Sequence, residues 1–221
     1  AGLGVSGYCR SSYLPAASSN QRNKSIAENR RAIRDAAALG APCFILVVGG
    51  LPEESRDLDA ARDMVVDGIA ALVDEARQAG VALAIEPMHP MYAADRSCVS
   101  TIEQSLDICR QLDPTASGVL TVAIDVYHVW WDPKLHLSIA RAGDEERLGA
   151  FHVSDWLVPT RDLLLDRGMM GEGIIDIPRI RRWVENAGFD GYAEVEIFSD
   201  RWWKVHPDKV LTEIHNALSN C

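Results

Sequence analysis

Leu120-Thr-Val-Ala-Ile-Asp125 is an apolar run that ends in a carboxylate, and three similar runs occur elsewhere in the 221-residue chain. Short apolar runs bounded by turn signals are typical of buried strands. Each run carries a side chain that can bind a metal ion near its C-terminal end. The other three runs are Val81-Ala-Leu-Ala-Ile-Glu86, Leu148-Gly-Ala-Phe-His152 and Tyr192-Ala-Glu-Val-Glu196. The repetition suggests that four strands each bring one polar residue to a common face.

The segments between these runs have the pattern of amphipathic helices, and several of them end at a glycine. A continuous apolar run over 43–48 fits a parallel strand that is covered on both faces. The pattern predicts six strand–helix units. Their strands are expected over 3–9, 43–48, 81–86, 120–125, 148–152 and 192–198, and their helices over 25–39, 57–78, 101–111, 133–142, 177–186 and 207–218.

Strands that alternate with helices throughout the chain favour a parallel α/β fold. The fold class that we predict is a TIM-type (β/α) barrel, formed as a single domain over 1–221. A closed barrel has eight units and typically about 250 residues, so we expect this chain to lack the first two βα units and to be N-terminally incomplete. An open doubly wound sheet would accommodate six units, but a nucleotide-binding one needs a glycine-rich phosphate turn after its first strand. Gly2, Gly4 and Gly7 do not have that spacing.

Composition narrows the class of protein further. With 48% hydrophobic residues, the chain can bury a core large enough for one domain. It has no run of 18 or more apolar residues and no recognisable secretory leader, so we expect no membrane partner. The five cysteines include no C-x-x-C pair, which favours reduced thiols in a cytoplasmic protein. The net charge of −10 argues against nucleic acid, whose partners usually carry a positive patch.

The strand ends indicate a metal site. In a parallel barrel the C-terminal ends of all strands open to one face, where active sites lie. Glu86, Asp125, His152 and Glu196 would then converge on one point. Three carboxylates so close together repel one another unless a cation neutralises them. We therefore predict one divalent metal ion, either Mn²⁺, Mg²⁺, Co²⁺ or Zn²⁺, because these ligand types do not select among the four.

Each of these residues also has an ordinary structural explanation. Glu86 could be a solvated residue at a strand end, Asp125 could cap a following helix, and His152 could be a satisfied core residue. Glu194 has the same strand parity as Glu196 and competes with it as the ligand from the last strand. We favour the metal site because all four residues occupy the same kind of position, near the C-terminal end of the strand in their strand–helix unit.

Five longer sequence motifs surround the strand ends. They are Ala84-Ile-Glu-Pro-Met-His-Pro90, Ile124-Asp-Val-Tyr-His-Val-Trp-Trp-Asp132, Phe151-His-Val-Ser-Asp155, Asp166-Arg-Gly-Met-Met-Gly-Glu-Gly173 and Val195-Glu-Ile-Phe198. Because it contains these motifs in this order, the chain resembles the sugar phosphate isomerase/epimerase branch of the xylose-isomerase-like barrel superfamily. The resemblance covers nearly the whole chain, but the superfamily also hosts dehydratases and an endonuclease.

The resemblance implies roles for single residues. The metal ligands that it implies are Glu86, Asp125, His152 and Glu196. It also implies that His128 contacts the substrate and that Arg167 faces it. His89, in a proline-bracketed loop on the same face, is a further candidate for substrate contact.

The connection over 156–173 is long for an α/β fold, and loops of this length usually carry function. Arg167 in this loop could hold a substrate oxyanion, and a surface salt bridge is the alternative reading. Three glycines, at 168, 171 and 173, would let the loop move as a lid.

The predicted function is a metal-dependent isomerase or epimerase that converts a small sugar, ketose or polyol through an enediolate. The resemblance implies that Glu86 and Glu196 flank the reacting carbon, where one removes the α-proton and the other returns it. A metal-dependent dehydratase, a lyase of a keto-inositol or dehydroshikimate-like acid, is the alternative. A phosphodiesterase and an inactive fragment rank below both. The expected partner is a small carbohydrate, and assembly into a homo-oligomer is compatible with the sequence.

Overall fold

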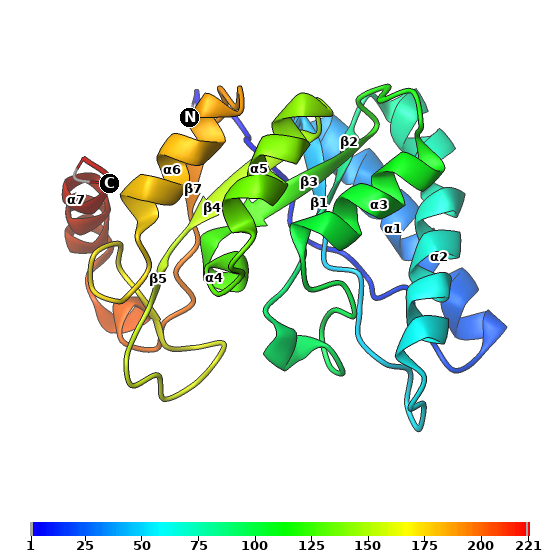
Figure 1. Ribbon diagram of the computed structural model, residues 1–221, viewed down its shortest axis with the longest axis horizontal. Helices are drawn as coiled ribbons and strands as arrows, with labels where there is room; N and C mark the ends of the chain where they lie inside the picture. The colour runs from blue at the N-terminus through cyan, green and yellow to red at the C-terminus, as the bar shows by residue number, and fades with distance from the viewer. Residues whose placement is uncertain (1, 220) are drawn as a thin grey trace.

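The computed structural model describes residues 2–219 and 221, which form a curled sheet of parallel strands with helices along it (Figure 1). The main sheet has the strand order β1-β2-β3-β4-β7, and neighbouring strands pair in parallel. The strands are β1 Cys43–Leu46, β2 Ala82–Ile85, β3 Leu120–Asp125, β4 Leu148–Val153 and β7 Ala193–Val195. This arrangement confirms the predicted TIM-type architecture and the absence of some of its units.

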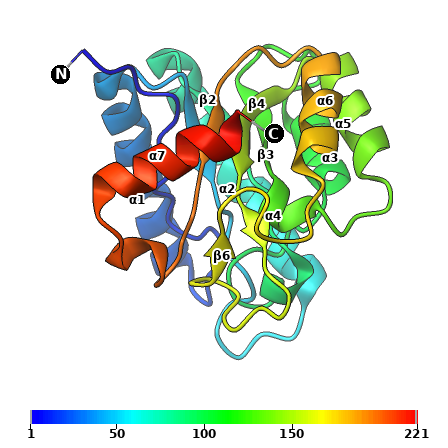
Figure 2. The ribbon, with the colours of Figure 1, turned by 90° about the vertical axis from the view of Figure 1, so that its left-hand side faces the viewer.

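Helices pack against the sheet, and most begin at a capping side chain (Figure 1). Asp57 accepts a hydrogen bond from the N–H of Ala60, and Thr101 accepts one from Gln104. In the view of Figure 2 the last helix, α7, crosses in front of the strands. The helices are α1 Ser19–Leu39, α2 Leu58–Ala79, α3 Ile102–Leu112, α4 Val126–Val129, α5 Leu135–Asp144, α6 Ile177–Asn186 and α7 Pro207–Leu218, with short 3₁₀ turns η1 Pro90–Tyr92 and η2 Trp202–Lys204.

The two faces of the sheet carry different side chains. On the outer face, large branched and aromatic residues pack against the helices and form the main core. The inner face carries a small buried cluster of Cys43, Ile45, Ala84, Ala123 and Ala150. Side chains alternate along a strand, so positions 86, 125 and 152 follow these alanines by two residues on the same face. The strand sequences therefore direct Glu86, Asp125 and His152 into the mouth of the curled sheet.

The strand predicted over 3–9 is only partly formed. It is reduced to a single bridge between Tyr8 and Phe44. The N–H of Tyr8 donates to the carbonyl of Cys43 at 3.0 Å, and the N–H of Ile45 donates to the carbonyl of Tyr8 at 2.9 Å. Glycines in this stretch have no side chain to pack, and Leu3 is 87% exposed. Pairing is therefore confined to Tyr8.

Other boundaries also differ from the prediction. The first helix begins at Ser19 rather than at 25, because the hydroxyl of Ser18 caps it by accepting the N–H of Gln21. The last strand is shorter than predicted, and the single turn α4 directly follows β3. The long connection contains a two-stranded antiparallel ribbon, formed by β5 Asp155–Trp156 and β6 Arg167–Gly168.

Among the described residues, no helix is both long and apolar enough to cross a membrane. All five cysteines are free thiols, as the sequence predicted. Cys43, Cys98 and Cys109 are buried, whereas Cys9 is exposed.

Candidate metal centre

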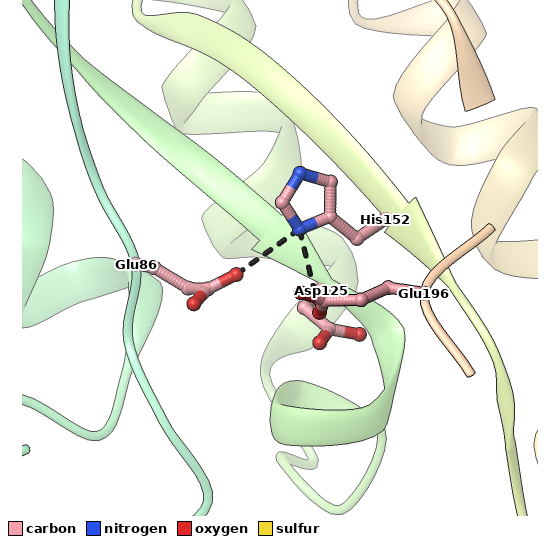
Figure 3. Close-up of side chains that lie close together, drawn as sticks. All are labelled: Glu86, Asp125, His152 and Glu196. Carbon is pink, nitrogen blue, oxygen red and sulfur yellow. Dashed lines mark hydrogen bonds and ion pairs between the residues drawn. The ribbon is translucent and has the colours of Figure 1, made fainter. Parts of the chain in front are cut away.

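Four ligand-type side chains meet where the strands of the curled sheet end (Figure 3). Glu86 directly follows β2, Asp125 ends β3, and His152 is the penultimate residue of β4. Glu196 directly follows β7. One ligand atom from each residue lies within 4.8 Å of the ligand atoms of the other three. The structure therefore brings together all four residues that the sequence predicted as metal ligands.

The spacing of the donor atoms fits a single bound ion. Nδ1 of His152 lies 3.1 Å from Oε1 of Glu86 and 3.9 Å from Oε2 of Glu196. Donors that each bind one ion at about 2.1 Å are at most about 4.2 Å apart. A small contraction of the cluster would place all four donors at bonding distance. Carboxylate oxygens with one imidazole nitrogen are also a donor set suited to Mg²⁺, Mn²⁺, Co²⁺ or Zn²⁺.

Burial makes the negative charge of this cluster costly. Asp125 is fully buried, and Glu86 is only 5% exposed. The side chain of Glu196 is 28% exposed and forms the most open part of the cluster. Carboxylates removed from water need a cation or hydrogen-bond donors to remain ionised. The cluster therefore requires positive charge.

Arg167 supplies positive charge to this cluster. Its Nη1 donates to Oδ2 of Asp125 at 2.9 Å and to Oε2 of Glu196 at 3.1 Å. The guanidinium also lies 4.4 Å from the centroid of the Tyr127 ring and 5.2 Å from that of Phe198. Arg167 is only 3% exposed. A surface salt bridge, the alternative reading of this residue, is therefore wrong.

Burial and neighbouring charges shift the pKa values of two ligand residues. Burial raises the pKa of Glu196 to about 7, and the charges of Asp125 and Glu86 act in the same direction. Burial alone would lower the pKa of His152, but the hydrogen bond and charge of Glu86 and the charge of Asp125 raise it to about 9. With no ion bound, His152 is therefore protonated at neutral pH. Protons then carry part of the charge that a metal ion would supply.

His128 lies beside the cluster and is neutral. Burial lowers the pKa of His128 to about 4. Its Nε2 accepts a hydrogen bond from Nη2 of Arg167 at 3.1 Å, since a guanidinium can only donate. The ring proton then lies on Nδ1, which is buried and has no hydrogen-bond partner among the described residues. His128 and Arg167 thus lie side by side at the site. Contact of either residue with a substrate stays a prediction.

A buried carboxylate that the sequence analysis did not select holds the loop after Arg167. Asp155 is fully buried and accepts backbone hydrogen bonds from Gly171 at 2.9 Å, Gly173 at 2.8 Å and Ile175 at 3.0 Å. An added Cβ at residue 173 would lie 2.2 Å from the carbonyl oxygen of Trp156, so this close approach requires glycine. The loop is anchored at this point, and its movement as a lid stays a prediction.

His89 lies in an aromatic group beside the site. Its ring stacks on Trp156 with centroids 4.9 Å apart and meets the edge of Trp131 at 6.0 Å. Burial lowers the pKa of His89. His89 is not in the wall of the cavity that contains Glu86 and Arg167. Its role in substrate contact therefore stays a prediction.

A cavity of about 290 Å³ opens beside the cluster. Its wall includes four predicted site residues, namely Glu86, His128, Arg167 and Glu196. It also includes Cys9, Arg10 and Arg96, which the sequence analysis did not select. These three residues lie on irregular segments, where no periodic pattern marks which side chains point inward.

The sequence matches the family model described as xylose isomerase-like TIM barrel over residues 1–221. The chain therefore belongs to the xylose isomerase-like TIM barrel family. Among curated proteins, no match to the sequence is found.

Solved structures support the same fold. The crystal structure of protein SMc04130 from Sinorhizobium meliloti 1021 is 57% identical to this chain, with a TM-score of 0.96 over 100% of this chain and 79% of that chain. The 3-keto-D-glucoside 4-epimerase YcjR from E. coli is 18% identical, with a TM-score of 0.77 over 100% of this chain and 80% of its own. The IolI protein with a bound zinc atom is 19% identical, with a TM-score of 0.77 over 99% of this chain and 75% of its own.

Proposed function

We propose that this chain is a divalent-metal-dependent isomerase or epimerase of a small sugar, ketose or polyol, which reacts through an enediolate. The observation that carries the proposal is the convergence of Glu86, Asp125, His152 and Glu196, whose ligand atoms lie within 4.8 Å of one another. The family, and the epimerases among its structural neighbours, support the same reaction class. The IolI structure, which contains a bound zinc atom, supports metal binding by a protein of this fold.

The ligand residues would hold one divalent ion at the strand ends. Such an ion polarises a carbonyl oxygen and so makes the neighbouring C–H more acidic. Four single-atom ligands would leave two positions open on an ion that takes six ligands, as a catalytic site requires. The dry surroundings of Asp125 and His152 strengthen this polarisation, because burial weakens screening by water.

Glu86 and Glu196 would move the α-proton of the substrate. Glu196 is the more open of the two, with a side chain that is 28% exposed, and so it is the better placed to reach a substrate carbon. Arg167 and His128 would hold the substrate oxygens. Arg167 cannot lose its charge and would stabilise the negative charge that develops on oxygen in the enediolate.

A proton-exchange experiment tests this function. We expect stoichiometric divalent metal in the purified protein and exchange of the α-proton of a ketose with D₂O, followed by NMR over a panel of ketoses. Glu196→Gln should slow exchange by at least roughly a hundredfold, as for loss of a general base. Asp67→Asn, an exposed change on α2, is the control.

Two results would contradict the proposal. One is a protein that binds no divalent ion at any concentration tested. The other is full exchange activity in Glu196→Gln. An absorbance band from a conjugated enone product would instead assign the dehydratase reaction to the same site.

A further inference from the structure

A larger cavity adjoins the cavity beside the ligand cluster. It has a volume of about 510 Å³, and we call it the outer cavity; the cavity of about 290 Å³ that contains Glu86 and Glu196 is the inner cavity. Ser11 and Tyr13 belong to the walls of both. Two further cavities, of about 450 and 470 Å³, share no wall residue with the inner cavity. The outer cavity is therefore placed to receive a part of a ligand that extends out of the inner one.

The chain segment between the two cavities is firmly held. The hydroxyl of Ser11 donates to the carbonyl of Val47 at 2.9 Å and accepts the N–H of Val47 at 3.0 Å. The N–H of Ser12 donates to Oδ1 of Asn29, and Nδ2 of Asn29 donates to the carbonyl of Ser12, both at 2.8 Å. Asn29 is fully buried. These four hydrogen bonds fix the backbone that leads into Tyr13.

Tyr13 is an aromatic surface at the junction of the two cavities. A Cβ added at Gly49 would lie 2.6 Å from the Cβ of Tyr13, so the backbone at position 49 packs directly against this residue. Tyr13 is nevertheless 40% exposed. An aromatic ring on a fixed backbone offers a large contact surface at a low cost in conformational entropy, and the tyrosine hydroxyl adds a hydrogen-bonding group. Tyr13 can therefore contact both parts of a ligand that spans the junction.

The wall of the outer cavity combines apolar surface with polar side chains. Pro15, Leu51 and Pro52 supply apolar surface, and Gln21 and Ser25 supply groups that bind hydroxyls. Ligand sites generally pair apolar walls with a few placed polar groups. A sugar ring has a matching character, because C–H groups cover its faces and hydroxyl groups surround its edge. The outer cavity therefore suits a sugar unit better than a purely apolar group.

The charge of the outer cavity disfavours an anionic ligand. Among the described residues that line it, the charged ones are Glu28 and Glu53, and both are acidic. The hydroxyl of Ser12 donates to Oε2 of Glu28 at 2.7 Å, and this bond orients the carboxylate. Carboxylate oxygens accept several hydrogen bonds, and sugar hydroxyls donate them. The group that fits this cavity is therefore neutral and rich in hydroxyls.

We infer that the substrate has two parts: a ketose in the inner cavity, whose reacting carbons face the ligand cluster, and a second, neutral sugar unit in the outer cavity, with Tyr13 against the link between them. This inference rests on the proposed function, because it places the reacting ketose in the inner cavity. Pockets for small molecules commonly have roughly 300–1,000 Å³. The inner cavity, at about 290 Å³, then fits one small sugar, and the outer cavity has room for another.

Calorimetry on the protein loaded with Mn²⁺ tests this inference. The probes are D-fructose and four disaccharides in which a hexose is joined to D-fructose through different hydroxyls, namely turanose, leucrose, isomaltulose and lactulose. We expect at least one disaccharide to bind roughly tenfold more tightly than D-fructose, since the second sugar adds hydrogen bonds to the outer cavity. The disaccharide that binds most tightly identifies the linkage that the junction at Tyr13 accepts.

Variants of the outer cavity locate the second sugar. The readout is the ratio of the dissociation constants of D-fructose and the preferred disaccharide, because Glu28 and Ala17 line the outer cavity and not the inner one. Glu28→Gln should reduce this ratio roughly tenfold, as for loss of a charge-assisted hydrogen bond. Ala17→Trp should abolish the preference, because the added ring fills the outer cavity. Asp35→Asn, which makes the same charge change at an exposed position of α1, is the control, and circular dichroism checks that each variant is folded.

The outcomes also separate this inference from the proposed function. The inference is overturned if no disaccharide binds more tightly than D-fructose, or if the preference survives in both Glu28→Gln and Ala17→Trp. Loss of the preference in either variant supports it. Exchange of the α-proton of D-fructose would still support the reaction where the inference fails. Conversely, a preference that depends on the outer cavity, without proton exchange in any of these sugars, would leave the two-part binding site standing and contradict the reaction.

Discussion

His152 and Glu194 are direct neighbours in the parallel register of β4 and β7, and Nε2 of the histidine lies 4.0 Å from Oε1 of the glutamate. Nδ1, on the other side of the ring, faces Glu86 and Glu196. Nε2 is buried and has no hydrogen-bond partner among the described residues. Glu194 is thus the nearest carboxylate to the ring nitrogen that points away from the ligand cluster. A small movement would let it accept that N–H.

Glu194→Ala should weaken metal binding. A carboxylate that accepts the second N–H of a ligand histidine orients the ring, and its loss typically costs about ten- to a hundredfold in metal affinity. Glu194→Gln keeps an acceptor oxygen and should lose less. The measurement is the dissociation constant of Mn²⁺, with Asp67→Ala on α2 as control. Equal affinity in Glu194→Ala and wild type would show that the ring is held without this residue.

The stability of the metal-free protein should fall as the pH rises from about 6.5 to about 9, because at lower pH the lowered pKa of His128 opposes the effect of Glu196. Folding raises the pKa of Glu196 from 4.5 to about 7, so its contribution is complete below pH 4.5 and is lost as the pH rises through 7. Folding raises the pKa of His152 from 6.5 to about 9, so its contribution is complete below pH 6.5 and is lost through 9.

Metal should oppose this loss, because an ion binds the deprotonated ligands and therefore binds more tightly at higher pH. Urea unfolding at several pH values, with and without Mn²⁺, gives both dependences. The stabilisation by Mn²⁺ should grow with pH. A stabilisation that is independent of pH would contradict the assignment of His152 and Glu196 as ligands.

Arg167→Lys should reduce turnover more than substrate affinity. Arg167 bonds Asp125, Glu196 and His128 through two different nitrogens, and a single ammonium cannot reproduce this fork. If the guanidinium stabilises charge in the transition state, kcat should fall roughly a hundredfold, while KM changes little. Steady-state kinetics on a ketose that the enzyme converts provides the measurement. A change confined to KM would assign Arg167 to ground-state binding only.

Asp155→Ala should loosen the loop after Arg167 without removing any ligand of the proposed metal. The lost hydrogen bonds to Gly171, Gly173 and Ile175 involve a charged acceptor, each worth about 1.5–3 kcal/mol, although compensation by water will reduce the total. Hydrogen exchange should accelerate over 168–175 more than in the sheet. Unchanged exchange in this segment would show that other contacts hold the loop.

The sequence was sufficient to predict the parallel architecture and the clustering of Glu86, Asp125, His152 and Glu196. These predictions rest on local apolar runs and on strand parity, which are visible in the sequence without knowledge of the partners. Parity could not separate Glu194 from Glu196, because both point to the same face. The register of β4 with β7 separates them, since it places Glu194 opposite His152 and Glu196 beyond the strand.

Features that depend on contacts between distant segments were not predictable. Asp155 acts through backbone groups of its own loop, and nothing in its flanking sequence marks that pairing. Arg10 and Arg96 are 86 positions apart on irregular segments and line the same cavity only in the folded chain. The 3–9 segment failed as a full strand because Gly4 and Gly7 have no side chain for packing.

The methyl groups of Ala84, Ala123 and Ala150 have a consequence for substitutions below the donor atoms. They lie in the buried cluster of the inner face, each two residues before Glu86, Asp125 or His152 in its strand. A valine at any of these positions would overfill this layer, which typically costs about 1–3 kcal/mol. A change that removes no ligand-type side chain would therefore still disturb the positions of the donor atoms.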